Sequence, residues 1–219
     1  MFLTLKSQER IELEHKQRPL GRPRQNKNTI STKDKIVNIA TKLFLNKGYQ
    51  IVSMDDVAKE CDVTKATVYY YYATKADLFT DTMVQMMVRI RENMYRILSS
   101  NKPLKERLLD VAKIHLTATM DIDIKSFMRD AKISLSDKHL KQMQDAEDKM
   151  YEVLAQTIDK AIQEGEIPKR HTLLSAHAFV ALLYVGDYKD VDQNPLIPDI
   201  EDLAQQIVDF YWNGLSKSL

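Results

Sequence analysis

Apolar residues recur every three or four positions along most of this chain, as they do on one face of an amphipathic helix. The first such stretch follows Ser31 and Thr32, either of which can cap a helix. Its apolar positions are Ile36, Ile39, Ala40, Leu43 and Phe44. We expect this helix to end at Gly48, because glycine readily adopts the left-handed backbone that follows many helices.

Two short helices and one long helix are predicted next, each beginning after a residue that caps helices well. They cover about residues 54–60, 65–71 and 75–98, and their caps are Ser53, Thr64 and Thr74. The turn between the short helices contains Asp62, a residue type that tolerates left-handed backbone. Asp77 completes a capping box with Thr74.

The rest of the chain is predicted to be helical as well. Further helices are expected at about residues 103–119, 124–134, 137–164, 169–186 and 198–216. Only 5 Gly and 6 Pro occur in 219 residues, which argues against an all-β fold with many turns. The pattern therefore predicts an all-α fold of about nine helices.

Charge changes this picture only locally. The formal net charge is +1, so the whole chain gives no sign of a nucleic-acid partner. Residues 15–28, however, hold five Lys and Arg and no acidic residue, which indicates a basic arm suited to phosphate. Pro19, Gly21 and Pro23 exclude a helix there, so we expect a flexible arm over residues 1–30.

Two short helices joined by a tight turn are typical of a helix-turn-helix, whose second helix enters the major groove of DNA. The second helix here reads TKATVYYYYATK from Thr64. At its start, Thr64 can contact a phosphate and Lys65 a phosphate or a guanine edge. Ala66 and Thr67 can touch a thymine methyl, and the Thr67 hydroxyl can also meet a base.

The four consecutive tyrosines cannot all face DNA, because successive residues of a helix point about 100° apart. Val68 and Tyr72 lie four residues apart and share a face, so we assign both to the core. Tyr69, Tyr70 and Tyr71 then remain for the DNA backbone and bases.

These residues are similar to the DNA-binding domain of the TetR family over about residues 32–80. The resemblance rests on Gly48-Tyr49, on the runs Ser53–Ala58 and Val63–Tyr72, and on Thr74–Phe79. It implies phosphate contacts from Ser53, Thr64, Tyr69, Tyr71 and Lys75. It implies that Lys65, Ala66, Thr67 and Tyr70 face the major groove. The chain departs from the family pattern at Asp62 and Ala66, where Gly is common, and at Tyr72, where Phe is usual.

The resemblance also implies a domain organisation and a function. Residues 31–78 would form the helix-turn-helix DNA-binding domain, and residues 79–219 a helical domain for ligand binding and dimerisation. The protein would be a DNA-binding transcriptional regulator, a repressor released from a palindromic operator by a small apolar or amphipathic molecule. The alternative is a DNA-bound structural or cell-division regulator of the same fold that responds to a protein partner.

The segment Gly21–Arg24 resembles the core of an AT-hook, in which an extended Arg-Pro-Arg lies in a narrow minor groove. Arg22 and Arg24 would make these contacts. The alternative is a solvated tail that adds only counterion release.

Apolar stripes on the last two helices predict a homodimer with two-fold symmetry, although ordinary intrachain core would also explain part of them. The stripe on the last helix is Leu203, Ile207, Phe210, Tyr211 and Leu215. That on the preceding helix is Leu174, Ala178, Phe179, Ala181, Leu182 and Leu183.

Several classes of protein are not supported by the sequence. It holds no P-loop, GxGxxG, GxSxG or HExxH motif, and its His residues lack metal-ligand spacing, so we expect neither an enzyme nor a cofactor or metal. A helical enzyme or adaptor is therefore the weaker alternative. No apolar run reaches the roughly 18 residues of a membrane span. With the single Cys61 and a charged start, we expect a cytoplasmic protein.

Overall fold

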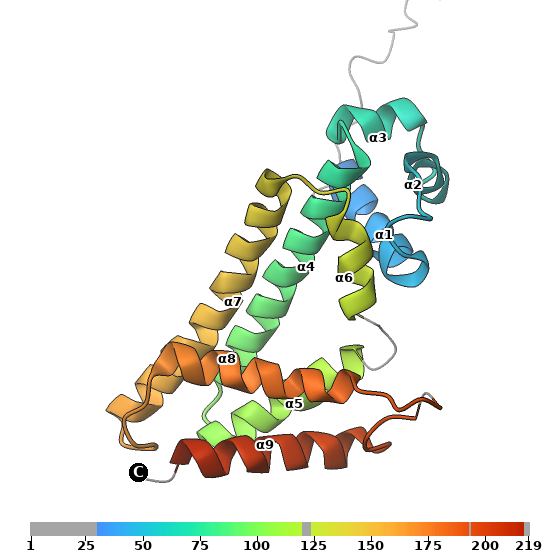
Figure 1. Cartoon of the computed structure of the whole chain (residues 1–219). Coiled ribbons are helices and arrows are strands. Elements are labelled where there is room, and N and C mark those ends of the chain that lie inside the picture. The colour runs from blue at the N-terminus through green and yellow to red at the C-terminus, as the bar shows by residue number, and fades with distance from the viewer. Residues whose placement is uncertain (1–29, 120–123, 193, 217–219) are drawn as a thin grey trace, which may run out of the picture. The chain divides into compact units, whose positions relative to one another are not determined.

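The structure, a computed structural model, describes residues 30–119, 124–192 and 194–216. Most of the described residues lie in helices, and the one β-bridge among them joins Lys189 and Pro195. The predicted all-α fold class is therefore confirmed for this part of the chain (Figure 1). The helices are α1 (Thr32–Lys47), α2 (Met54–Glu60), α3 (Lys65–Tyr71), α4 (Lys75–Leu98), α5 (Leu104–Thr119), α6 (Ile124–Lys132), α7 (Asp137–Gln163), α8 (Thr172–Leu183), the 3-10 helix η1 (Tyr184–Asp187) and α9 (Ile200–Ser216).

Helices α1, α2 and α3 and the first turns of α4 enclose one hydrophobic core. At its centre the ring of Phe79 meets the rings of Phe44 and Tyr49 edge-on, with centroids 5.2 and 4.9 Å away. Gly48 ends α1 with a φ of 83°, as its position in the sequence predicts. The aromatic cluster thus fixes α1 against α4, on the side of the molecule that carries α3 (Figure 1).

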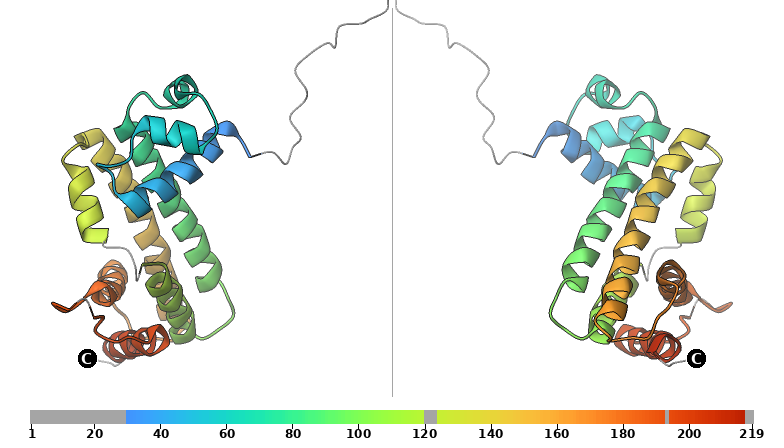
Figure 2. Two further views of the ribbon diagram at one scale, coloured as in Figure 1. Left: turned by 90° about the vertical axis from the view of Figure 1, so that its right-hand side faces the viewer. Right: turned by 90° about the vertical axis from the view of Figure 1, so that its left-hand side faces the viewer.

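Helix α4 reaches from this first core into a second one. Leu78 and Phe79 are fully buried near its start, and Met94 and Leu98 are buried in the second core near its end. Helix α7 runs beside α4, as Figures 1 and 2 both show. A single rigid element therefore connects the region of α3 with the carboxyl-terminal helices.

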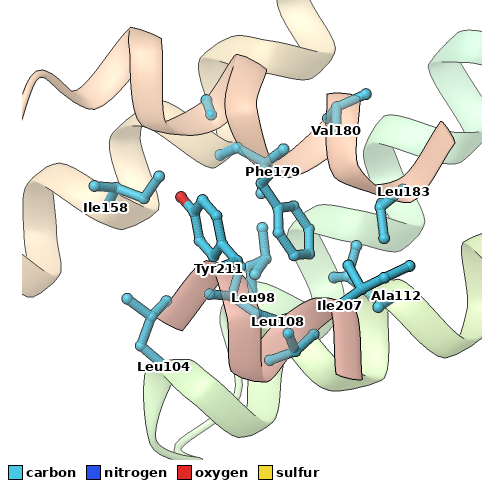
Figure 3. Close-up of a cluster of buried hydrophobic side chains, with 14 of the residues drawn as sticks. Leu98, Leu104, Leu108, Ala112, Ile158, Phe179, Val180, Leu183, Ile207 and Tyr211 are labelled. Carbon is cyan, nitrogen blue, oxygen red and sulfur yellow. The ribbon is translucent and has the colours of Figure 1, made fainter. Parts of the chain in front are cut away.

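The second core lies among α4, α5, α7, α8 and α9. Figure 3 shows Phe179 of α8 and Tyr211 of α9 facing one another, with Leu108 of α5 beside them. The Tyr211 hydroxyl donates to the Ser175 carbonyl at 2.9 Å, so this buried phenol has its hydrogen bond. Arg107 donates to the Leu98 carbonyl at 2.8 Å and closes the turn between α4 and α5.

Helix α6 and the start of α7 belong to the first core as well. Ala131 and Met143 are buried there among residues of α1 and α4. The Gln50 side chain also donates to the Asp130 carbonyl at 2.9 Å. The sequence did not predict this contact between the α6–α7 corner and the amino-terminal helices.

Helix ends differ from the prediction mainly at α8. It begins at Thr172 instead of 169, because the His171 ring accepts a hydrogen bond from the Leu174 amide and caps it. It ends at Leu183, where the chain tightens into η1. Over residues 30–119, 124–192 and 194–216, no helix is long and apolar enough to cross a bilayer.

Most of the predicted apolar stripe on α9 belongs to the core of its own chain, the alternative that the sequence left open. Four of its five residues are buried in the core of their own chain, because α9 packs on α5 and α8: these are Leu203, Ile207, Tyr211 and Leu215. Phe210 alone of the stripe is exposed, at 73%. On α8, Phe179 and Leu183 are buried in the same way, whereas Leu174, Ala178 and Ala181 remain exposed.

Candidate nucleic-acid interface

Helices α2 and α3 form a helix-turn-helix. The turn between them holds Asp62 with a φ of 50°, the left-handed conformation predicted for it. The Val63 amide donates to the Ala58 carbonyl at 3.0 Å and closes the turn. Cys61 is fully buried behind it, and burial raises the pKa of its thiol. The closed turn and the packing of small side chains behind it therefore hold the two helices at a fixed angle.

Both helices begin at the predicted caps. The Ser53 hydroxyl accepts from the Asp56 amide at 3.1 Å, and the Asp56 carboxylate accepts from the Ser53 amide at 2.9 Å. The Ser53 hydroxyl also donates to the Asp56 carboxylate at 2.6 Å, and this bond, followed by that from the Ser53 amide, holds the pKa of Asp56 below its usual range. Thr64 accepts from the Thr67 amide at 3.1 Å, and the two threonine hydroxyls lie 2.8 Å apart. The Ser53, Thr64 and Thr67 hydroxyls thus take part in hydrogen bonds at the helix starts.

The structure confirms that Tyr72 belongs to the core and that Tyr69, Tyr70 and Tyr71 are exposed, while their contact with DNA stays a prediction. Tyr72 is buried at 5% exposure, while Tyr69, Tyr70 and Tyr71 are 44%, 81% and 37% exposed. Val68 is fully buried and anchors the helix together with Tyr72. Helix α3 therefore presents tyrosine rings to solvent on the face that does not pack on α2.

The Tyr72 hydroxyl finds its partner on α4. It donates to the Asp81 carboxylate at 2.6 Å, and Lys33 of α1 forms an ion pair with the same oxygen at 3.1 Å. Burial works to raise the pKa of Asp81, but the hydrogen bonds from Tyr72 and Lys33 outweigh it and hold that pKa below its usual range. The extra hydroxyl of Tyr72 thus ties the end of α3 to both α1 and α4.

Lys65, the first residue of α3, is paired with an acid on α2. Its Nζ lies 2.8 Å from the Asp55 carboxylate and 5.9 Å from the centroid of the Tyr69 ring. The hydrogen bond with Asp55 raises the pKa of Lys65. Both side chains are more than half exposed, so the pair is accessible from the α3 surface. Sequence reasoning missed Asp55, because only the angle between α2 and α3 brings it to Lys65.

Lys75, of which a phosphate contact is expected, binds backbone carbonyl oxygens in the structure. Its Nζ donates to the carbonyl oxygens of Tyr49, Gln50 and Val52, at 2.9, 3.3 and 3.1 Å. It also lies 4.4 Å from the centroid of the Tyr49 ring. Burial lowers the pKa of this amine. All of these partners belong to the turn between α1 and α2.

The remaining predicted site residues fall into two groups. Ala66 is exposed at the start of α3 and lies next to Thr67, which is partly exposed. Arg22 and Arg24 lie outside the described residues. No cluster of His, Cys, Asp or Glu in the described part of the chain could hold a metal ion.

Two hollows border α4. One, of about 210 Å³, lies between α1 and α4 beside Asp81 and Arg89. The other, of about 300 Å³, is lined by Arg91, Glu92 and Tyr95 of α4 and by Val153 of α7. The second combines an aromatic ring and an aliphatic side chain with charged groups.

Residues 36–82 match the family described as bacterial regulatory proteins, tetR family. The chain is 25% identical over 192 residues to YhgD, an uncharacterised HTH-type transcriptional regulator of Bacillus subtilis, covering 87% of this chain and 100% of that one. It is 40% identical over 47 residues to IcaR, the negative regulator of the biofilm operon icaADBC in Staphylococcus epidermidis. That match covers 22% of this chain and 25% of IcaR, and thus only a quarter of the relative.

Solved structures share the whole fold at low identity. A TetR-family regulator from Mesorhizobium loti superposes with a TM-score of 0.68 and 21% identity, over 85% of this chain and 97% of that one. FadR of Bacillus subtilis, solved in complex with stearoyl-CoA, gives a TM-score of 0.65 and 18% identity, over 82% and 97% of the two chains. Residues 36–82, which contain the helix-turn-helix of α2 and α3, thus match the TetR family of bacterial transcriptional regulators, and the chain shares its fold with solved members of that family.

Proposed function

We propose that this regulator is a repressor that binds a palindromic operator as a homodimer and leaves it when a small apolar or amphipathic molecule binds. The observation that carries the DNA-binding part is the exposed face of α3. Val68 and Tyr72 anchor the helix from behind, and Tyr70 stands 81% exposed in front. Such a rigidly held helix with an open face suits insertion into the major groove.

Within this interface we assign roles by position on α2 and α3. Lys65, Ala66, Thr67 and Tyr70 would read base edges, since they lie on the exposed start and face of α3. Phosphate contacts would come from residues beside them, which fix the position of the helix on DNA. These are Ser53, Thr64, Tyr69 and Tyr71. The basic arm with Arg22 and Arg24 would add minor-groove contacts on A·T-rich flanks.

We expect Lys65 to exchange partners when DNA binds. Its ammonium is occupied by Asp55 in the free protein, at 2.8 Å. An exposed ion pair of this kind contributes little to stability, so a phosphate or a guanine can displace the carboxylate at low cost. Asp55 would then lie near the DNA and limit how strongly Lys65 binds to any sequence.

The dimer would form through α8 and α9, using the part of the predicted surface that stays exposed. On α8, Leu174, Ala178, Ala181 and Val185 follow one another at spacings of four, three and four residues. This spacing gives a continuous apolar stripe along α8 and into η1. Phe210 of α9 adds a large exposed ring. Two such surfaces related by a two-fold axis would place two α3 helices on one palindrome.

The inducer would bind near α4, because α4 connects the second core with the α3 region. The hollow beside Tyr95 and Val153 has about 300 Å³ and offers Arg91 for an anionic group. FadR of Bacillus subtilis, which shares the fold, binds stearoyl-CoA. A long-chain acyl-CoA, with an apolar tail and an anionic head, is therefore the first ligand to test.

The DNA-binding proposal is tested with the DNA upstream of the protein's own gene, in a mobility-shift assay, and then with a library of randomised operators. Tyr69→Phe should weaken binding to all sequences alike, whereas Thr67→Val should change the preferred bases. Tyr188→Phe is the matched control, because Tyr188 is exposed but lies far along the chain, after η1. Unchanged sequence preference in Thr67→Val would contradict the assigned role of that residue.

The inducer proposal has its own test. Thermal stability is measured with and without the acyl-CoA, and operator affinity is measured under the same conditions. A ligand can release DNA only if it binds the two conformations of the dimer with different affinity. An acyl-CoA that raises the melting temperature but leaves operator affinity unchanged would contradict the inducer role.

A further inference from the structure

The Lys75 ammonium uses all of its hydrogen-bond donors on the turn between α1 and α2. An ammonium group has three N–H donors and no acceptor. Here Nζ reaches three carbonyl oxygens, those of Tyr49, Gln50 and Val52, within 2.9–3.3 Å. The Tyr49 ring lies 4.4 Å away and adds a cation–π contact. No donor remains for a DNA phosphate unless one of these bonds breaks.

The turn that Lys75 binds leads directly into the DNA-binding helices. Val52 precedes Ser53, the cap of α2 and a proposed phosphate contact. Tyr49 belongs to the aromatic cluster with Phe44 and Phe79, which fixes the other end of the turn in the first core. The bonds from Lys75 therefore join the start of α4 to the start of α2.

We propose that Lys75 is a positioning residue, not a phosphate ligand: its ammonium holds the carbonyls of residues 49–52 and thereby places Ser53 and α2 for DNA binding. This inference rests on the proposed binding of DNA by α2 and α3. It reverses the role that the family resemblance implies for Lys75. The positive charge serves the fold of the turn instead of the DNA backbone.

Substitution by arginine separates the two roles. A phosphate contact accepts a guanidinium readily, often with two hydrogen bonds. Three carbonyls that converge on one atom suit a compact ammonium and do not suit a planar guanidinium. We therefore expect Lys75→Arg and Lys75→Met to weaken operator binding similarly, by on the order of tenfold. Full affinity in Lys75→Arg would overturn the proposal.

The salt dependence of binding gives the second readout. Each lost phosphate contact reduces the slope of log affinity against log salt by about 0.9, or by about 1.8 for the two subunits of a dimer. We expect the slope of both Lys75 variants to equal that of the wild type. Lys42→Met, which removes an exposed charge from α1, is the control for a change of net charge. A slope reduced by about 1.8 in Lys75→Met alone would identify Lys75 as a phosphate ligand.

A double-variant cycle shows whether Lys75 acts through Ser53. If it does, Lys75→Met and Ser53→Ala together should weaken DNA binding by less than the product of their separate fold-changes. Independent effects on affinity would contradict a role through Ser53.

Hydrogen exchange in the protein without DNA tests the contact itself. Amides of residues 49–53 should exchange faster in Lys75→Met than in Lys42→Met, while amides of α8 and α9 stay protected. Unchanged exchange in this turn would overturn the proposal. Since this measurement needs no operator, it gives a result even if the wild type binds none of the DNA tested, an outcome that would instead refute the proposed function.

Discussion

At the scale of residues, the hydroxyl of Tyr72 stabilises the carboxyl-terminal end of α3. It donates to Asp81 at 2.6 Å, and Asp81 is also paired with Lys33. Tyr72→Phe should lower the free energy of unfolding by roughly 1–2 kcal/mol, because a half-buried carboxylate loses one of its donors. Urea denaturation measures this loss. Tyr70→Phe is the control: because Tyr70 is 81% exposed, this substitution should leave the free energy of unfolding unchanged.

The pair of Asp55 and Lys65 leads to a prediction about affinity. Asp55→Asn should free Lys65 and raise affinity for operator and unrelated DNA alike, because a positive charge contributes to binding of any phosphate backbone. Glu60→Gln makes the same charge change at the other end of α2 and should raise DNA affinity less than Asp55→Asn does. Binding to both DNAs is measured at two salt concentrations. An increase confined to the operator would show that Asp55 does not restrain Lys65 in this general way.

Single residues were predicted well where local spacing decides their place. The burial of Val68 and Tyr72 and the exposure of Tyr69–Tyr71 follow from the helical repeat. The sequence also indicated that the Tyr72 hydroxyl needs a partner. It identified neither Asp81 nor the three carbonyl oxygens that Lys75 binds. Both contacts depend on how separate helices cross, which no local pattern records.

At the scale of helices, a contact between His139 and Asp77 joins the amino-terminal ends of α7 and α4. His139 lies 3.1 Å from the Asp77 carboxylate, and Asp77 also completes the capping box of α4 with Thr74. Two hydrogen bonds lower the pKa of Asp77: the one from the Thr74 side chain has the larger effect, and the one from His139 has the smaller effect. A carboxylate with a lowered pKa in the folded state stabilises the protein above its unfolded pKa of about 3.9, and this contribution is lost as the pH falls through the folded value.

This link can be tested by titration. His139→Ala should raise the pKa of Asp77 toward its unfolded value, so that Asp77 contributes less stability near neutral pH and this smaller contribution is fully lost at a higher pH. Carboxyl chemical shifts measure the pKa, and denaturation as a function of pH measures the stability. His171→Ala removes a histidine that caps α8 and has no contact with Asp77, so it should leave that pKa unchanged. Identical Asp77 titrations in His139→Ala and the wild type would exclude the link.

Helix ends were predictable because they carry local chemical signals. Ser53, Thr64 and Thr74 cap their helices as expected, and Gly48 and Gly165 follow helix ends with positive φ. The position of the α6–α7 corner in the first core was not predictable. Ala131 and Met143 show a helical repeat like any other, and nothing in that repeat states which core receives them.

At the scale of the whole molecule, the exposed apolar stripe on α8 predicts that a charge placed on it weakens dimerisation. Leu174→Glu should shift the molecule toward monomer, because two glutamates would meet across an apolar two-fold interface. Leu173→Glu is the control, since Leu173 is also exposed but lies off the stripe. Sedimentation measures the association. Equal dissociation in both variants would argue against this surface.

The sequence predicted apolar stripes on the last two helices but could not divide their residues between core and interface. Tyr211 and Phe210 are neighbours of similar character, yet the first is buried and the second 73% exposed. Only the packing of α9 on α5 and α8 separates them. The structure therefore narrows the expected dimer surface to residues that no partner within the chain covers.

The burial of Cys61 makes it a built-in probe of the helix-turn-helix. It is the only cysteine in the sequence and is fully buried, and burial raises the pKa of its thiol. An added thiol reagent can therefore react only when α2 opens away from α1. The labelling rate reports the opening of this region alone, with no engineered reporter. Operator DNA that holds α2 and α3 in place should slow the labelling, whereas an inducer that releases the DNA should restore the faster rate.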